Sequence, residues 1–345
     1  MSRLLRRTLY AIVAGALLYA GAMIWFDAKT IAAQLADFPW WRFAVAIALS
    51  SANYLLRFMK WELSLGWLDV RKTAPQLTRS RSLVVYLAGL SMSISPGKLG
   101  EVLRSALLKA SDDVPFSRTA PIVVADRLTD LIALVLLSLV GVSRFSEYLP
   151  IVLVTALLVV VGVVVLGTPR ILHPLLRRMS GLPVVGRFAG RAELLVDSAA
   201  VVLRIKPLVV LSALSVVGWG LECLGFWIVL GGFAGVDVSL TLAAFLWATG
   251  TLVGALSFLP GGLFAAEGSL ALATTRLVVG ATAPMALAAT MLGRTATLWY
   301  GELVGAIALA IFLRNPEVRA RAFAAAPQTT ERPGADGDGG QGVGG

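Results

Sequence analysis

Six apolar segments that are long enough to cross a membrane decide what this chain can fold into. They lie at about 8–27, 41–58, 117–143, 150–168, 208–232 and 284–312. Each is near or above the roughly 20 residues that a helix needs to cross the hydrocarbon core. The chain is 57% hydrophobic and 14% charged, a composition typical of integral membrane proteins. Because lipid offers the backbone no hydrogen-bond partners, the spans must be helices, and we predict an all-α polytopic bundle.

Two further apolar stretches are each interrupted by a Pro-Gly pair. They cover 82–110, with the pair Pro96-Gly97, and 239–279, with the pair Pro260-Gly261. Proline removes a backbone donor and clashes with the preceding turn, while glycine tolerates non-helical angles. In lipid, the freed backbone groups need protein or cavity water as partners. We therefore predict that each stretch is a re-entrant hairpin whose break lines a cavity.

The distribution of basic residues predicts the orientation of the spans. With a cytoplasmic N-terminus, most basic residues fall in segments on the inner side, Arg57 and Lys60 among them, as the positive-inside rule requires. The outer segments hold only Lys29, Arg42, Arg144 and Arg276. The net charge of +10 therefore indicates topology rather than a nucleic-acid partner. We predict a multi-pass protein of the cytoplasmic membrane with both termini in the cytoplasm.

The order of spans and breaks suggests an internal repeat. Each half reads as span, span, Pro-Gly hairpin, span, and an odd number of crossings makes the second hairpin open to the opposite side. "SPGKLGE" at 95–101 parallels "LPGGLFAAE" at 259–267, and a deep arginine follows each break, Arg127 and Arg294. Inverted repeats with broken helices are typical of alternating-access transporters whose substrate site lies near the midplane. The alternative is that the two kinks are unrelated.

These patterns divide the chain into three parts. We expect a first membrane repeat at 1–145 with its hairpin at 82–110, a second, inverted repeat at 146–315 with its hairpin at 239–279, and a disordered cytoplasmic tail at 316–345. Within the second repeat, segment 169–207 combines helical apolar spacing with basic residues. It is either an amphipathic helix on the anionic inner leaflet or an ordinary basic loop.

Ionisable side chains inside spans are expensive and point to a functional site. Asp126, Arg127 and Asp130 lie about 15 Å into their span, near the middle of the hydrocarbon core. Asp126 and Asp130 share a helix face, and Arg127 is placed for a local ion pair with Asp130. The alternative is a salt bridge that locks helices together, with Lys98 or Arg104 as partner.

The second half holds a similar set of charges. Arg294 must find a carboxylate or an anionic ligand, and Glu267 and Glu302 are the candidates. Glu222, in the middle of another span, serves either as a site residue or as a protonated structural group. The helix that resumes after each break presents unpaired N–H groups, which favour an anion such as phosphate or carboxylate.

Other kinds of chemistry have little support in the sequence. There is no nucleotide-binding glycine motif, and one cysteine and one histidine provide neither a thiolate metal cluster nor histidine-based catalysis. We expect no metal and no cofactor. Proton coupling through a buried carboxylate remains open.

At "SPGKLGEVLRSALL", "VVADRLTDLIALV" and "LPGGLFAAEGSLALA" the chain resembles the lysylphosphatidylglycerol synthase transmembrane-region family, a flippase-like membrane family. The matching positions are Pro96, Gly97, Gly100, Glu101, Arg127, Asp130, Pro260, Gly261, Gly262 and Glu267. The resemblance implies a membrane region that moves aminoacylated phospholipid between leaflets. Only a short tail follows Leu313, so we expect no synthase domain and no enzymatic activity. Phe264 departs from the family pattern, which has a small residue there.

We therefore expect a flippase-like transporter that moves an anionic or amphiphilic lipid between leaflets. The alternatives are a small-solute or ion transporter and a non-transporting accessory protein of a lipid- or glycan-modifying enzyme, and a homo-oligomer is also open. The candidate substrate-binding residues are Pro96, Gly97, Lys98, Gly100, Glu101, Arg104, Asp126, Arg127, Asp130, Pro260, Gly261, Gly262, Glu267, Arg294 and Glu302.

Overall fold

The computed structural model describes residues 28–94, 101–142, 145–180 and 189–314. Within these ranges the chain is helical with no β-strand, and Asp237 and Val279 form one isolated antiparallel bridge. The predicted all-α fold is confirmed. The expected first span at 8–27, the Pro96-Gly97 pair and the tail at 316–345 lie outside the described residues.

Long helices form the body of the molecule. They are α3 (Trp41–Trp67), α7 (Phe116–Val142), α8 (Leu149–Gly167), α12 (Ile205–Leu230) and the continuous run of α15 (Ala283–Arg294), η5 (Thr295–Trp299) and α16 (Tyr300–Arg314). By length and composition, α8, α12 and the run from Ala283 to Arg314 can cross a membrane. Helices α3 and α7 have 27 residues each, but they carry charged side chains in their middle parts.

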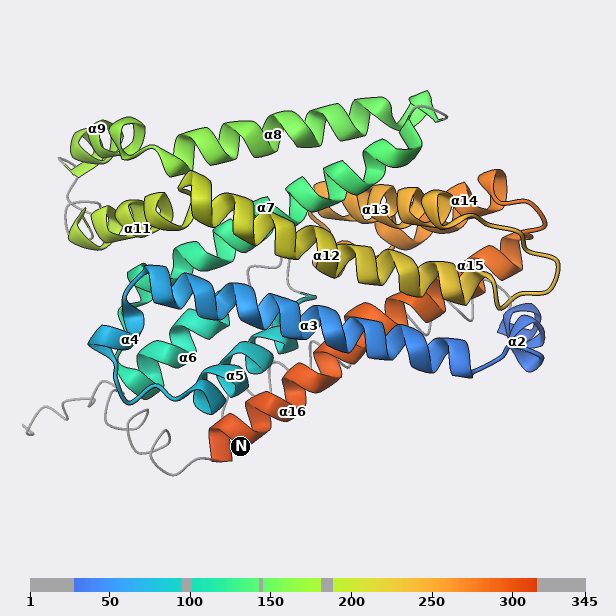
Figure 1. Ribbon diagram of the computed structural model, residues 1–345, viewed down its shortest axis with the longest axis horizontal. Coiled ribbons are helices and arrows are strands. Elements are labelled where there is room, and N and C mark those ends of the chain that lie inside the picture. The colour runs from blue at the N-terminus through green and yellow to red at the C-terminus, as the bar shows by residue number, and fades with distance from the viewer. Residues whose placement is uncertain (1–27, 95–100, 143–144, 181–188, 315–345) are drawn as a thin grey trace, which may run out of the picture.

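Two helix pairs, which we call the first and second hairpins, flank the predicted positions of the breaks, and the first break itself lies outside the described residues. The first consists of α5 (Arg79–Ala88), the 3-10 helix η1 (Gly89–Met92) and α6 (Leu103–Asp112); the second consists of α13 (Leu240–Leu256), η4 (Pro260–Gly262) and α14 (Ala265–Leu277). Figure 1 shows the two hairpins at opposite ends of the long helices. Side-chain oxygens of Thr78 and Ser239 cap the first helix of each hairpin, which satisfies amide groups that would otherwise lack partners.

The two halves of the chain are packed reciprocally. Helix α5 of the first hairpin packs on α16, and α13 of the second hairpin packs on α7. Helices α3 and α12, which precede the two hairpins, pack against each other along their lengths. Each hairpin is therefore held by the long helix that belongs to the other half.

The second break lies against the described end of the segment that leads to the first break. Gly261 has a φ of +62° and Gly262 a φ of +67°, a left-handed conformation that glycine adopts at little cost. A Cβ atom on Gly261 would lie 3.4 Å from the Cα atom of Ile94, the last described residue before the first break. The backbone of the second break thus packs directly on the described segment that precedes the first break.

The remaining helices lie around this body. They are α2 (Ala28–Ala36), α4 (Val70–Thr73), η3 (Ser146–Tyr148), α9 (Pro169–Ser180) and α11 (Ala189–Val202). The segment expected to be amphipathic forms α9 and α11, and α11 packs on α7 with Val196 and Val202 buried. Helix α8 consists almost entirely of valine and leucine and exposes most of them, as expected for a helix that faces lipid.

Candidate substrate cavity

A cavity of about 310 Å³ lies where the two breaks approach each other. Its walls come from α3, α7, α8, α12, α13, both breaks and the run from α15 to α16. The charged side chains that line it are Arg57, Glu101, Arg127, Asp130, Glu222 and Arg294. Each arginine lies within ion-pair distance of a carboxylate, so an anionic ligand here competes with the protein's own carboxylates.

A ladder of polar contacts joins α3 to α12, and its members Arg57, Trp219 and Glu222 line the cavity. Asn53 donates to Glu222 at 2.5 Å, the guanidinium carbon of Arg57 lies 5.1 Å from the ring centroid of Trp219, and Lys60 donates to Ser215 at 2.7 Å. Along α3 the contacting residues are spaced i, i+4 and i+7, so they share one face of the helix. Their partners on α12 follow in the reverse order, as expected for antiparallel helices.

A glycine lets the two helices approach closely at the first contact. A Cβ atom on Gly218 would lie 2.3 Å from the amide oxygen of Asn53. A larger residue there would push Asn53 away from Glu222. Glu222 also accepts a hydrogen bond from the indole of Trp247 at 3.3 Å, so neutral donors from two helices hold its carboxylate.

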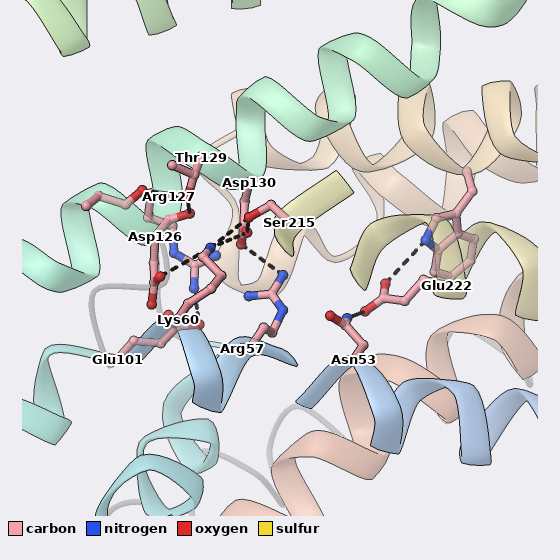
Figure 2. Close-up of polar contacts among 12 residues, drawn as sticks. Asn53, Arg57, Lys60, Glu101, Asp126, Arg127, Thr129, Asp130, Ser215 and Glu222 are labelled. Carbon is pink, nitrogen blue, oxygen red and sulfur yellow. Dashed lines mark hydrogen bonds and ion pairs between the residues drawn. The ribbon is translucent and has the colours of Figure 1, made fainter. Parts of the chain in front are cut away.

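Asp130 on α7 connects the ladder to the opposite wall (Figure 2). One carboxylate oxygen lies 2.8 Å from Arg57, and the other lies 3.1 Å from Lys60 and accepts from Ser215 at 2.9 Å. Asp130 therefore has two cations and a hydroxyl as partners. The predicted local pair with Arg127 is replaced by these contacts, because α3 brings its cations to the same face of α7.

Asp126 belongs to a second, fully buried cluster. Its carboxylate lies 3.2 Å from Lys60 and 3.5 Å from Arg104. The guanidinium of Arg104 stacks on Tyr86 with its central carbon 4.3 Å from the ring centroid, and its side chain closely contacts Gly89. Neither Asp126 nor Arg104 lines the cavity. This part of the charge network has the geometry of the helix-locking alternative.

The two halves repeat one ion pair at corresponding places. Arg127 on α7 pairs with Glu101, which follows the first break. Arg294 on α15 pairs with Glu267 of α14, which follows the second break, with 2.7 Å between Nε and Oε1. Arg294 also donates to the backbone carbonyl of Gly261 at 2.7 Å. In both halves an arginine of the long helix thus holds the hairpin break that precedes it.

Glu302 has a different partner from the one expected. Of the two candidates for Arg294, Glu267 forms the ion pair, and Glu302 instead accepts a hydrogen bond from the backbone N–H of Ile94 at 2.8 Å. A carboxylate of the second half therefore caps the backbone at the edge of the first break. This contact satisfies an amide group that the end of η1 leaves free.

The helix after Arg294 contains a local irregularity. Residues Thr295–Trp299 form a π-helix, a feature that occurs often at functional sites. The hydroxyl of Tyr54 on α3 donates to the carbonyl of Thr297. Tyr54 and Thr297 both line the cavity, so α3 supports the irregular turn from the inside.

One side of the cavity is apolar and reaches the outer surface of the bundle. Leu158 on α8 lines the cavity and is 52% exposed, and Phe258 and Leu259 at the second break line it and are 75% and 43% exposed. Phe258 and Phe264 have positive φ angles of 53° and 67°, a strained conformation for a bulky residue. The second break therefore presents large apolar side chains beside the cavity.

The predicted site residues separate into three groups. Those that line the cavity are Glu101, Arg127, Asp130, Gly261, Gly262 and Arg294. Those that are described but do not line it are Arg104, Asp126, Pro260, Glu267 and Glu302. Pro96, Gly97, Lys98 and Gly100 lie outside the described residues. In the described part of the chain, no group of three or more His, Cys, Asp or Glu side chains is placed to hold a metal ion.

Sequence reasoning missed the α3 side of the cavity. Arg57 and Lys60 were assigned to the cytoplasmic end of a span, but α3 continues to Trp67, Lys60 is buried, and Arg57 is partly buried and lines the cavity. Their spacing could have predicted a polar face. Asn53, Arg57 and Lys60 lie at i, i+4 and i+7, so they share one side of a helix that is otherwise largely apolar.

Residues 12–305 match the family model described as lysylphosphatidylglycerol synthase TM region. The match includes every residue that lines the cavity. Comparisons with curated proteins and with solved structures find no match.

Proposed function

Because the chain belongs to the lysylphosphatidylglycerol synthase transmembrane-region family, we propose that it moves an anionic lipid between the leaflets of the cytoplasmic membrane. The observation that carries the proposal is the cavity between the two breaks, with arginines from both halves on its walls and apolar side chains on one side. The proposal assigns no catalytic step to this chain and needs no cofactor.

The arginines are the proposed contacts for the lipid head group. Arg57, Arg127 and Arg294 come from three different helices and surround one cavity. Guanidinium groups bind phosphate oxygens through paired, charge-assisted hydrogen bonds. The described lining of the cavity holds three arginines and three carboxylates, Glu101, Asp130 and Glu222, so a head group binds by drawing an arginine away from its carboxylate partner.

Two-sided access is proposed from the placement of the hairpins. The two hairpins lie at opposite ends of the long helices (Figure 1), and Gly261 of the second break lies against Ile94, the last described residue before the first break. Under the proposed topology, the first hairpin opens to the cytoplasm and the second to the outside. An inverted repeat of this kind allows the site to be exposed to either side in turn.

The apolar side of the cavity favours a lipid over a water-soluble substrate. Leu158, Phe258 and Leu259 line the cavity and are also exposed at the surface of the bundle. Acyl chains can therefore remain in the bilayer while the head group occupies the cavity. A site for a soluble ion has no need of such an opening.

Transport should depend on the arginines that line the cavity. The assay follows fluorescent phosphatidylglycerol between leaflets of reconstituted vesicles. The variants are Arg127→Gln and the double variant Arg294→Gln with Glu267→Gln, which leaves no buried carboxylate without its cation. Each lost charge-assisted contact should slow transport about tenfold or more.

Arg276→Gln provides the control, because Arg276 is exposed in the last turn of α14 and does not line the cavity. Wild-type rates in both cavity variants would remove the proposed site. Uptake of a soluble anion without lipid movement would favour a solute transporter, and binding without movement would favour an accessory protein.

A further inference from the structure

We propose that Arg57 and Trp219 form the oxyanion-binding contact of the cavity, with a phosphodiester or phosphate group as ligand. The inference rests on the proposed function; it adds Trp219 as a binding residue and distinguishes Arg57 from the other arginines of the cavity. Arg57 on α3 and Trp219 on α12 come from the two helices that precede the hairpins, so the contact lies at the boundary between the two halves.

Arg57 can change partner at a lower cost than Arg294. Its ion-pair partner Asp130 also has Lys60 at 3.1 Å and the Ser215 hydroxyl at 2.9 Å, both on its other oxygen. If Arg57 turns to a ligand, Asp130 stays compensated. By contrast, Arg294 is the ion-pair partner that the described structure provides for Glu267, and moving it would leave a buried carboxylate without a cation, which is expensive.

Trp219 holds the guanidinium of Arg57 in place without using its hydrogen-bond donors. The guanidinium carbon lies 5.1 Å from the Trp219 ring centroid, within the range of a cation–π interaction. Stacking on a ring fixes the plane of the guanidinium while its edge N–H groups remain able to donate. A planar fork fixed in this way is suited to two oxygens of one phosphate group.

Trp219 also has a donor that needs an acceptor. Its side chain is 5% exposed and lines the cavity, and among the described residues its indole N–H has no hydrogen-bond partner. A buried donor without a partner is costly. An oxyanion that binds Arg57 lies beside the same ring and supplies the missing acceptor. One ligand group therefore satisfies both side chains.

The test measures binding by titration calorimetry with the full chain in detergent. The probes are dioctanoyl phosphatidylglycerol, dioctanoylglycerol, which lacks the phosphodiester, and inorganic phosphate. Trp219→Phe keeps an aromatic ring and removes the indole N–H together with the five-membered part of the indole, and Arg57→Gln removes the cation while Asp130 keeps Lys60. We expect each variant to bind the phospholipid about tenfold more weakly, the loss typical of one hydrogen bond to a charged group.

The same helices supply matched controls. Arg42 on α3 stacks on Trp41 at 5.2 Å, and Trp227 on α12 donates to the Val238 carbonyl at 2.8 Å; neither lines the cavity. Arg42→Gln and Trp227→Phe should bind as the wild type does. Dioctanoylglycerol should not bind measurably at the site.

The outcomes separate this inference from the proposed function. If Arg57→Gln and Trp219→Phe keep wild-type affinity while Arg127→Gln loses it, the assignment to Arg57 and Trp219 is overturned and the lipid site remains. If inorganic phosphate binds as tightly as the phospholipid with the same losses, the oxyanion contact is supported and lipid transport is contradicted. If the wild type binds neither phosphate probe, both proposals fail.

Discussion

Single side chains show how this protein keeps charges inside an apolar bundle. Lys60 is 1% exposed and lies between Asp126 at 3.2 Å and Asp130 at 3.1 Å. One buried cation therefore serves two carboxylates, each of which has a second partner from another helix. Such a network stabilises the folded state mainly by avoiding unpaired buried charge.

Replacing Lys60 should destabilise the protein strongly. Lys60→Met leaves Asp126 and Asp130 with one cation each, and we expect a loss of about 3 kcal/mol, the lower end of the range for breaking a buried pair. Thermal unfolding in detergent measures it. Adding Asp126→Asn should recover part of the loss. Lys72→Met is the control, because Lys72 pairs with Asp69 at an exposed site and should change stability by less than about 0.5 kcal/mol.

The sequence predicts these charged side chains better than it predicts their partners. Arg127, Asp130, Arg294 and Glu267 stand out because charge inside a span is rare. Arg57 was overlooked because a basic residue near the end of a span also fits the positive-inside rule. The hydrogen bond between Glu302 and the backbone of Ile94 depends on how the two halves pack. The spacing of residues along the chain does not predict such a contact.

The helices around the cavity differ in how many polar side chains they carry. Helices α3, α7 and α12 carry charged or polar side chains on the faces that line the cavity. Helix α8 carries almost none and exposes most of its side chains. Leu157 and Leu158 are neighbours on α8, with exposed fractions of 63% and 52%, but of the two only Leu158 lines the cavity.

This pair tests whether acyl chains pass beside α8. Leu158→Trp adds bulk at the apolar edge of the cavity and should slow transport of phosphatidylglycerol in vesicles several-fold, while Leu157→Trp adds the same bulk toward lipid and should not. Inhibition by both variants, or by neither, would argue against a lateral opening at this place. Both substitutions keep an apolar surface, so folding should be unaffected.

Individual elements were predicted well where neighbouring residues alone determine the structure. The interruption of the helix at Pro260-Gly261 was predicted from the pair itself, because proline removes a backbone donor and glycine tolerates a positive φ. The length of α3 was underestimated, because Arg57 and Lys60 ended the apolar run in the sequence although they are paired in the fold. Segment 169–207 was also ambiguous because of its basic residues. They indicate an exposed segment, whereas in the structure α11 packs on α7.

The arrangement of the whole molecule joins two halves that hold each other's hairpins. Helix α5 packs on α16, α13 packs on α7, and α3 and α12 form the boundary between the halves. Arg127 with Glu101 and Arg294 with Glu267 repeat one contact in each half. A shift of one half relative to the other would therefore move both breaks together, which is the property that alternating access requires.

Alternating access requires that the two hairpins have opposite orientations in the membrane, and we predict that they do. Single cysteines are introduced as Lys109→Cys in α6 and Arg276→Cys in α14, both at exposed positions near the outer ends of the hairpins. The native Cys223 is buried and is replaced in a Cys223→Ser background. A membrane-impermeant maleimide should label position 276 in intact cells and position 109 only in inverted vesicles.

The labelling pattern shows whether the two hairpins open to the same side of the membrane or to opposite sides. Labelling of both positions from one side would mean that both hairpins open to the same compartment, and the cavity between their breaks would then have a single entrance. Labelling from opposite sides places one break within reach of each leaflet. Under the proposed function, passage between the two sides must then be controlled near Ile94 and Gly261, because the segment that leads to the first break lies against the second break there.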